Sequence, residues 1–358
     1  MKANLVQNDN FFAGKKLDLQ FFATVLNTTE SSGMNAEMKT FYEKRLIDQA
    51  EPKLIHDQFG DFYPIPLNGG KTIEFRKYDS LAKATTPLTE GVTPDGQSLN
   101  VSTITATLSQ YGGWTPESDV LSMTAIDNNI LNATKVLASQ AGRTMDTITR
   151  DVLAGGTNVI YCSNVSSAGV ETEVTARDDL DMTSMLTPNI FFRAAAQLGA
   201  MNADTVGDSF VAIIHPYAAY DLKCNQDFID ISKYANPEAI FTGEIGKLGN
   251  IRFVETSEAK IWKDDTCPTL TTGSGDDAVT STLAVFGTLV LGAHAYGVTE
   301  LEGGGLEHIV KQLGYGDDPL NQRASIGWKG LKCAERLVEQ YMVRIESLSS
   351  YSATAAAN

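Results

Sequence analysis

His215 and Asp221 come nearest to an acid–base pair in this chain, in residue type and in spacing. His215 follows the apolar run VAII and precedes Pro216, so it stands at the end of a predicted strand, where a general base can reach a substrate. A histidine at the end of a strand more often hydrogen-bonds to the neighbouring backbone. The chain has four histidines without an H-x-x-x-H pair, and it lacks a G-x-S-x-G elbow, a Walker loop and a zincin motif. A soluble cytosolic enzyme built around His215 and Asp221 is therefore kept only as an alternative hypothesis.

The glycine-rich and acidic segments predict no cofactor site and no metal site. GEIGKLGNIR and LEGGGLEH do not follow a strand and open a helix in the frame of a phosphate cradle, so we interpret them as turns. RDDLDM, KDDTC and SGDDAV lack the alternating ligands and the glycine of an EF-hand loop, so we interpret them as solvated turns. Asp317 and Asp318 are adjacent, and adjacent side chains of an extended chain point apart, which argues against a shared catalytic proton.

The four cysteines are predicted to be free and buried. They are widely scattered, and a chain of 358 residues has enough core to fold without disulfides. Because the fold needs no disulfides, a reducing cytoplasm is the favoured compartment. Free cysteine is among the most buried residue types, which favours buried thiols. The cysteines are Cys162, Cys224, Cys267 and Cys333.

Charge and hydropathy disfavour two classes of partner. The chain has 44 acidic and 28 basic residues and a formal charge of −16, so a phosphate backbone would repel its surface. No apolar run approaches the roughly 20 residues of a membrane-spanning helix. LDLQFFATVLN resembles the core of a signal peptide, but Asp18 and Gln20 interrupt it. We expect a soluble protein that binds neither nucleic acid as its main task nor a membrane.

The N-terminal third begins with an arm and a short helix. Residues 1–33 lack strong periodicity and carry Phe11, Phe12, Phe21 and Phe22, which need a surface to cover them. The stripe of apolar residues in NAEMKTFYEKRLIDQAEP predicts a helix that ends before Pro52.

A long helix is predicted over residues 116–154. Thr115 suits the N-cap and Pro116 the first helical position. Apolar residues then recur every three or four positions up to Val152, and Gly155 and Gly156 end the pattern. An unbroken helix of this span would be about 57 Å long, and Gly142 could kink it.

The rest of the chain predicts a mixed α+β fold. TPNIFFRAAAQLGAMNA predicts a helix that starts at Thr187 and Pro188, and DSFVAIIHP, NIRFVET and TLAVFGTLVLG predict strands. KDDTCPTLTTGSGDDAVTST between them is predicted as a loop. NQRASIGWKGLKCAERLVEQYMVRIESLS alternates at both ends like strands, and SSYSATAAAN is predicted as a tail.

A long polar segment separates two strand-like stretches near residue 90. KTIEFRKY and LNVSTITATLSQY alternate with a period of two, while the segment between them is rich in Thr, Pro and Gly. A loop of this length without a core of its own indicates either function or disorder.

Five stretches along the chain carry a family resemblance. LIHDQFGD, KTIEFRKYDSLAKATTPLTEGVTPDG, YGGWTPESD, RDVLAGGTNVIY and GYGDDPLNQRASIGWKG resemble major capsid proteins of tailed bacteriophages. These proteins share the fold first seen in the Hong Kong phage (Hong Kong 97-like, or Johnson fold). The resemblance is to the podovirus-type family associated with the N-four group of phages. It spans residues from about 36 to 347.

The resemblance implies six segments. They are an N-terminal arm (1–35), an N-terminal helix and connector (36–70), an extended loop or two-stranded arm (71–110), the peripheral-domain spine helix with the following segment (111–186), an axial domain (187–300), and a return to the peripheral domain with the C-terminal tail (301–358).

It also implies a function without catalysis or cofactor. The protein would assemble through pentamers and hexamers into the icosahedral shell around a double-stranded DNA genome, in the cytoplasm of the bacterial host. Its partners would be other copies of itself, a portal protein, a scaffold and a decoration protein. DNA would be enclosed without sequence-specific binding. The residues expected to contact other subunits are Lys71, Phe75, Lys77, Leu81, Leu88, Leu99, Val101, Phe21 and Phe22.

Some relatives of this fold cross-link covalently through a lysine and an asparagine. Lys71, Lys77 and Lys83 lie on or beside the loop, but no matching acceptor is identified, so no cross-link is predicted. Two alternatives share part of the pattern. An encapsulin-like compartment would have the same fold, and the viral stretches argue against it. A β-rich adhesin or tail component is disfavoured by the long helix.

Overall fold

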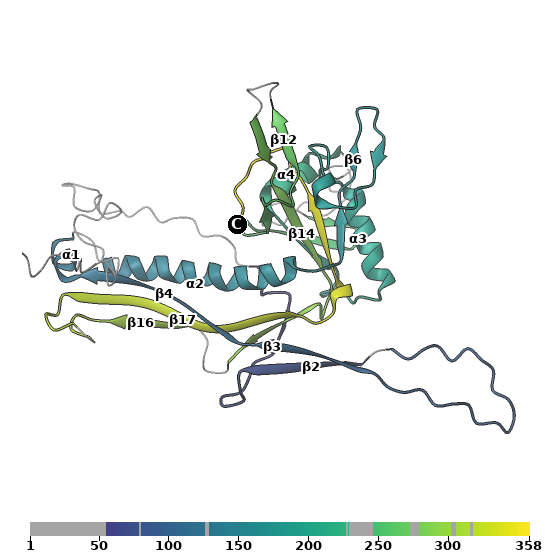
Figure 1. Ribbon diagram of the computed structural model, residues 1–358, viewed down its shortest axis with the longest axis horizontal. Coiled ribbons are helices and arrows are strands. Elements are labelled where there is room, and N and C mark those ends of the chain that lie inside the picture. The colour runs from purple at the N-terminus through teal and green to yellow at the C-terminus, as the bar shows by residue number, and fades with distance from the viewer. Residues whose placement is uncertain are drawn as a thin grey trace, which may run out of the picture. The chain divides into compact units, whose positions relative to one another are not determined.

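The computed structural model describes residues 55–78, 80–125, 129–226, 228, 246–272, 279–301, 306–315 and 318–358 (Figure 1). The predicted N-terminal arm, with Phe21 and Phe22, and the predicted helix before Pro52 lie outside these residues. The described chain forms two compact units. The larger contains residues 55–113, 136–307 and 328–358, and the smaller contains residues 114–135 and 308–327.

A mixed sheet of seven strands forms the centre of the larger unit. β10 runs parallel to β8, β18 runs parallel to β5, and β14 runs antiparallel to both β8 and β18. The strands at DSFVAIIHP, NIRFVET and TLAVFGTLVLG are confirmed. The order is β5 (Val159–Tyr161), β18 (Met342–Ser347), β14 (Val285–Leu291), β8 (Phe210–Ile214), β10 (Ile251–Glu255) and β9 (Lys247–Leu248), and β11 (Ile261–Trp262) pairs with β14.

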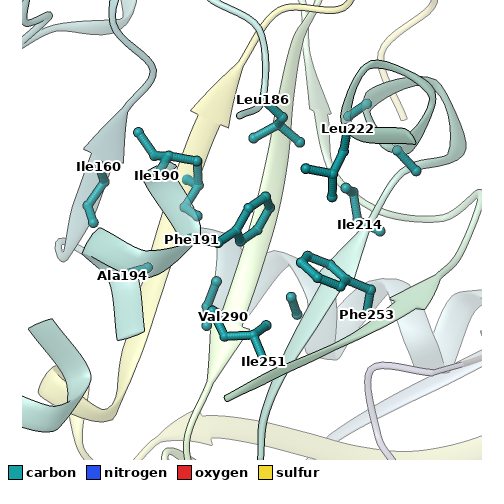
Figure 2. Packing of buried hydrophobic residues seen from close by; sticks show 14 of the residues in the cluster. Ile160, Leu186, Ile190, Phe191, Ala194, Ile214, Leu222, Ile251, Phe253 and Val290 are labelled. Carbon is teal, nitrogen blue, oxygen red and sulfur yellow. The ribbon is translucent and has the colours of Figure 1, made fainter. Parts of the chain in front are cut away.

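Both faces of this sheet are buried, which explains its continuous apolar strands. Ala212 and Ile214 of β8 face one hydrophobic cluster, whereas Val211 and Ile213 face another. Figure 2 shows the first cluster, in which the ring of Phe191 meets that of Phe253 edge to face at 4.8 Å.

Two helices supply side chains to the first cluster. α3 (Pro188–Ala200) starts at the predicted Thr187–Pro188, so that boundary is confirmed. α4 (Pro216–Cys224) follows β8 directly, and the side chain of His215 accepts a hydrogen bond from the backbone N–H of Tyr217 at 3.1 Å. In both helices proline occupies the first turn, where a missing N–H costs no hydrogen bond.

The segment predicted as a loop before residue 283 contains a β-hairpin, so that prediction is wrong. β12 (Thr269–Thr272) pairs with β13 (Val279–Thr282), with Thr271 opposite Thr280. The hydroxyl oxygens of these two threonines lie 3.1 Å apart. Threonine is β-branched and favours strands, and this preference outweighed the surrounding glycine and aspartate signals.

The start of the predicted long helix is also wrong. Residues 116–118 belong to β4 (Ser109–Ser118), which pairs with β17 (Arg323–Arg336). The helix α1 (Asp119–Thr124) begins only after Ser118, whose hydroxyl accepts the N–H of Leu121 at 3.2 Å. Strand pairing over residues distant in sequence therefore overrides the local Thr-Pro start signal.

The helix is divided after residue 124. Ala125 is extended, with ψ at 140°, and α2 (Asn129–Ala154) contains 26 residues. It is about 39 Å long rather than the predicted 57 Å. It continues through Gly142 and ends before Gly155 and Gly156, as predicted.

Two arginines from the C-terminal strands bind the last carbonyls of α2. Arg344 Nη1 donates to the carbonyl oxygens of Ala154 and Gly156, the latter at 2.8 Å. Arg336 Nη1 donates to the carbonyl oxygen of Val152 at 2.7 Å. Cations at a helix C-terminus satisfy free carbonyls and oppose the negative end of the helix dipole.

β17 runs for 14 residues, and its side chains alternate between buried and more exposed positions over most of its length, as predicted. Its C-terminal end pairs with β15, from Glu300 opposite Lys332 to Tyr296 opposite Arg336. The strands of its sheet are β1 (Asp61–Phe62), β15 (Tyr296–Glu300), β17, β16 (Glu307–Lys311) and β4.

Three smaller elements complete the larger unit. They are the hairpin of β6 (Asn164–Val165) and β7 (Glu171–Thr172) and the 3-10 helices at Arg177–Asp179 and Glu339–Tyr341.

The final stretch, predicted as a tail, is bound to the larger unit. The backbone N–H of Ser350 donates to Asp221 at 3.1 Å, and the ring of Tyr351 stacks on Tyr217 at 4.7 Å. The N–H of Ile261 donates to Asn358 Oδ1 at 2.9 Å.

Candidate assembly surfaces

The segment between residues 71 and 110 forms a two-stranded arm. β2 (Thr72–Tyr78) pairs in antiparallel register with β3 (Val101–Thr107) from Thr72 opposite Thr107 to Tyr78 opposite Val101 (Figure 1). The two strands form a sheet of their own, so each has an unpaired outer edge. Isolated hairpins are marginally stable in water, and unpaired edges favour contact with another chain.

The loop beyond the two strands has no core of its own. Every described residue from 80 to 100 is exposed, and Leu88 retains 76% of its accessible surface. Leu81 and Leu99 are exposed too, at 50% and 65%. Val92, at 62%, is a further apolar side chain that the sequence prediction did not single out. Several exposed apolar side chains on one segment are a common feature of surfaces that bind another molecule.

The two faces of the hairpin differ. Ile73, Phe75 and Lys77 are half-buried along β2, whereas the residues between them are exposed. The ring of Phe75 packs edge to face on Tyr63 at 5.1 Å. Phe75, predicted to contact another subunit, thus has a partner within its own subunit.

Two further predicted contact residues of the hairpin are more exposed to solvent. Lys71 and Val101 are exposed, and Tyr78, the cross-strand partner of Val101, is 64% exposed. Tyr78 was missed by the sequence prediction, although its position in the alternation could have identified it.

A buried polar cluster fixes the chain that leads into the arm. His56 Nδ1 lies 2.6 Å from Asp146 Oδ2, and Asp146 Oδ1 accepts the N–H groups of Ile55 and His56 at 3.0 and 2.9 Å. Lys332, itself buried, forms an ion pair with Asp57. Because α2 and β17 supply Asp146 and Lys332, the base of the arm is attached to regular structure while its tip is exposed.

The smaller unit also exposes large apolar side chains. Its segments are connected by a hydrogen bond from the N–H of Asp119 to the carbonyl of Gln322 at 3.1 Å. Eight of its large apolar side chains are exposed. They are Trp114, Val120, Met123, Leu131, Val310, Leu313, Tyr315 and Leu320.

A notch of about 240 Å³ opens on the smaller unit. Its walls include Trp114 and Pro116 of β4, Lys311 of β16, Tyr315 and Arg323. We name it the Trp114–Tyr315 notch. Its volume lies below that of usual small-molecule pockets, roughly 300–1,000 Å³, and suits a few side chains.

His215 has a structural role. Its Nδ1 accepts the N–H of Tyr217, and its ring packs on Tyr217 and Phe286 at centroid distances of 4.8 and 5.2 Å. Burial lowers the pKa of His215 to about 4. Asp221 is bound to Ser350 instead of to the imidazole. The structure therefore does not bring His215 and Asp221 together as an acid–base pair, and the expected backbone hydrogen bond is confirmed.

The cysteine prediction is partly confirmed. All four are free; Cys162 and Cys267 are buried, and burial raises the pKa of both thiols. The prediction is wrong for Cys224, which is exposed at the end of α4, and for Cys333, which is half-buried in β17.

The described residues contain neither a cluster of metal ligands nor a helix that could span a membrane. Among them, no group of His, Cys, Asp and Glu side chains is placed to hold a metal ion. No helix in the same residues is both long enough and apolar enough to cross a membrane. At KDDTC, Asp264 accepts the N–H of Thr266 at 3.0 Å and so closes a turn.

Comparison with known proteins supports the predicted capsid family. The sequence profile of the phage capsid protein family matches residues 70–313, more than half of the chain. No curated protein sequence matches significantly.

Solved phage capsids share the fold at low sequence identity. The capsid of Ralstonia phage GP4 has a TM-score of 0.61 and 13% identity, covering 90% of this chain and 98% of that one. The cyanophage Pam1 capsid has a TM-score of 0.63 and 11% identity, covering 88% and 98%. The capsid of Helicobacter pylori bacteriophage KHP30 has a TM-score of 0.60 and 12% identity, covering 97% and 100%. The chain belongs to the phage capsid protein family and has the α+β fold of phage major capsid proteins.

Proposed function

We propose that this protein assembles through pentamers and hexamers into the icosahedral shell that encloses the double-stranded DNA of a tailed phage. The two-stranded arm is the observation that carries the proposal. Its edges are unpaired and its loop is exposed from residue 80 to residue 100. A second copy that covers this arm gains hydrogen bonds along a strand edge and buries apolar side chains such as Leu88.

Symmetry converts these contacts into a shell. In a closed assembly the same patch is used by every copy, so a weak contact is repeated many times. The arm would lie on the neighbouring subunit, and residues 187–300 would form the domain around the five-fold and six-fold axes.

The proposed assembly is non-enzymatic and takes place in the host cytoplasm. The formal charge of −16 favours an inner wall that repels DNA and encloses it without sequence-specific binding. A portal protein, a scaffold and a decoration protein would complete the particle. The podovirus-type grouping belongs to the same proposal.

Deleting Ser80–Ser98 tests the role of the arm. Because the described residues of this segment are exposed, their removal should leave a folded and soluble subunit that no longer closes shells. Sedimentation and electron microscopy measure shell formation, and circular dichroism measures folding.

The control changes an equally exposed residue elsewhere. Val170 lies beside β7 and is 61% exposed, so Val170→Ser should assemble normally, whereas Leu88→Ser with Val92→Ser should weaken assembly. Normal shells from the Ser80–Ser98 deletion would contradict the proposed function.

A further inference from the structure

Asn68 is the only asparagine of the chain that precedes a glycine. The side-chain amide carbon of an asparagine can close a ring with the backbone nitrogen of the next residue. A Cβ atom on that next residue hinders the closure, whereas glycine leaves the nitrogen open to it. The pair Asn68–Gly69 therefore has the residue types that spontaneous deamidation requires.

The fold places this pair in an exposed turn. The N–H of Gly69 donates to the carbonyl oxygen of Pro66 at 2.9 Å, and Asn68 occupies the third position of the turn with φ at 65°. Every residue from Pro66 to Gly70 is exposed, and a Cβ atom added at Gly70 would meet nothing within 4 Å. The side chain of Asn68 makes no hydrogen bond to another described residue. A single backbone hydrogen bond thus restrains the attacking nitrogen, and solvent reaches the pair.

The turn lies between two anchored points of the larger unit. On one side Ile65 is buried, and its N–H donates to the carbonyl oxygen of Glu300 at 2.9 Å. On the other side the carbonyl oxygen of Lys71 accepts the N–H of Leu108 at 2.9 Å, immediately before β2. The length of main chain between these points therefore sets where the arm begins.

We propose that Asn68 is a site of spontaneous deamidation that alters the base of the two-stranded arm. The backbone nitrogen of Gly69 bonds to Cγ of Asn68, the Cγ–Nδ2 bond breaks, and the amide leaves as ammonia with the proton of the attacking nitrogen. Water then opens the succinimide ring that has formed. Opening at Cγ gives aspartate, and opening at the backbone carbonyl carbon gives isoaspartate. The reaction consumes water and needs neither a cofactor nor an enzyme.

Isoaspartate changes the turn more than aspartate does. Both products place a new negative charge at residue 68, but isoaspartate also routes the main chain through the side-chain carbons. The link between Ile65 and Lys71 then gains a carbon, so the cross-strand pair of Thr72 and Thr107 loses its fixed starting point. Isoaspartate at residue 68 should therefore loosen the base of the arm.

Peptide mass spectrometry of the full chain tests the site. The protein is incubated at mildly alkaline pH, where the backbone nitrogen loses its proton more readily, and is then digested with trypsin. Residues 54–71 form one tryptic peptide, in which Asn68 should gain the mass that –OH adds in place of –NH2.

Two asparagines of the same chain serve as matched controls. Asn202 and Asn321 are exposed and share the left-handed φ of Asn68, at 56° and 54°. They precede Ala203 and Gln322, which carry a Cβ atom, so Asn68 should convert about tenfold or more faster than either. Equal rates at all three would overturn the role of Gly69.

The synthetic peptide PLNGGKT carries the same pair without the fold. Conversion of Asn68 in both the peptide and the folded chain supports the site. Conversion of the peptide while Asn68 of the folded chain stays intact would overturn the inference, because the turn would then shield the pair.

Hydrogen exchange measures the effect on the arm. Asn68→Gly cannot deamidate, and glycine adopts the left-handed φ of this position, so the variant should fold as the wild type does. The N–H of Leu108 and those of β2 should exchange faster in aged wild type, in proportion to its isoaspartate, and at an unchanged rate in aged Asn68→Gly. Equal acceleration in both proteins would overturn the effect on the arm. Neither readout depends on shell formation.

Discussion

His215 shows how one residue can resemble a catalytic base and serve the fold. His215 stands at the end of β8, which suggested a catalytic base. The same position makes it the residue before α4, where its Nδ1 caps the helix. Capping uses the neutral imidazole, and burial keeps it neutral by lowering its pKa to about 4.

This pKa predicts a loss of stability in acid. Between about pH 6.5 and about pH 4 the unfolded chain binds a proton at His215 that the folded chain does not, so the free energy of unfolding falls as the pH falls. A pKa shift from 6.5 to about 4 corresponds to about 3 kcal/mol, which is lost in full only below about pH 4. His215→Asn retains a capping side chain, so the variant should fold and assemble near pH 7 and show a smaller acid slope.

Urea titrations of unassembled subunits at several pH values measure this slope. Equal slopes for the wild type and His215→Asn would show that His215 does not cause the acid loss. Failure of the well-folded variant to assemble near pH 7 would contradict the structural role.

At the scale of elements, the spacing of apolar residues predicted that a helix or strand exists better than it predicted where the element begins and ends. The apolar repeat identified α2, and the two glycines identified its end. Its beginning could not be predicted, because Pro116 joins β4 only when β17 is present as a partner. Threonine at alternate positions in β12 and β13 was a signal for the missed hairpin.

The two arginines at the C-terminus of α2 should contribute unequally to the free energy of unfolding. Arg344→Met leaves the carbonyls of Ala154 and Gly156 without their donor and removes one partner of the buried Glu346, so unfolding should become about 3 kcal/mol easier. Arg336→Met, the matched control at a more exposed site, should cost about 1 kcal/mol. Urea denaturation of unassembled subunits distinguishes the two, and equal costs would argue against the buried-charge explanation.

At the scale of the whole molecule, the arm and the notch differ in how far sequence can reveal them. The arm is continuous in sequence, so its alternation and its Thr- and Pro-rich loop predicted it. The notch draws Trp114 and Tyr315 from segments about 200 residues apart, and only the fold shows that they share one surface. Pentamers and hexamers depend on contacts between copies and remain part of the proposal.

The most direct test of the account is electron microscopy of the full chain expressed alone, with sedimentation of the same sample. The account predicts closed particles, or rings of five and six subunits that close as the concentration rises. A stable monomer at every concentration, with or without a crowding polymer, would contradict assembly through the chain's own arm.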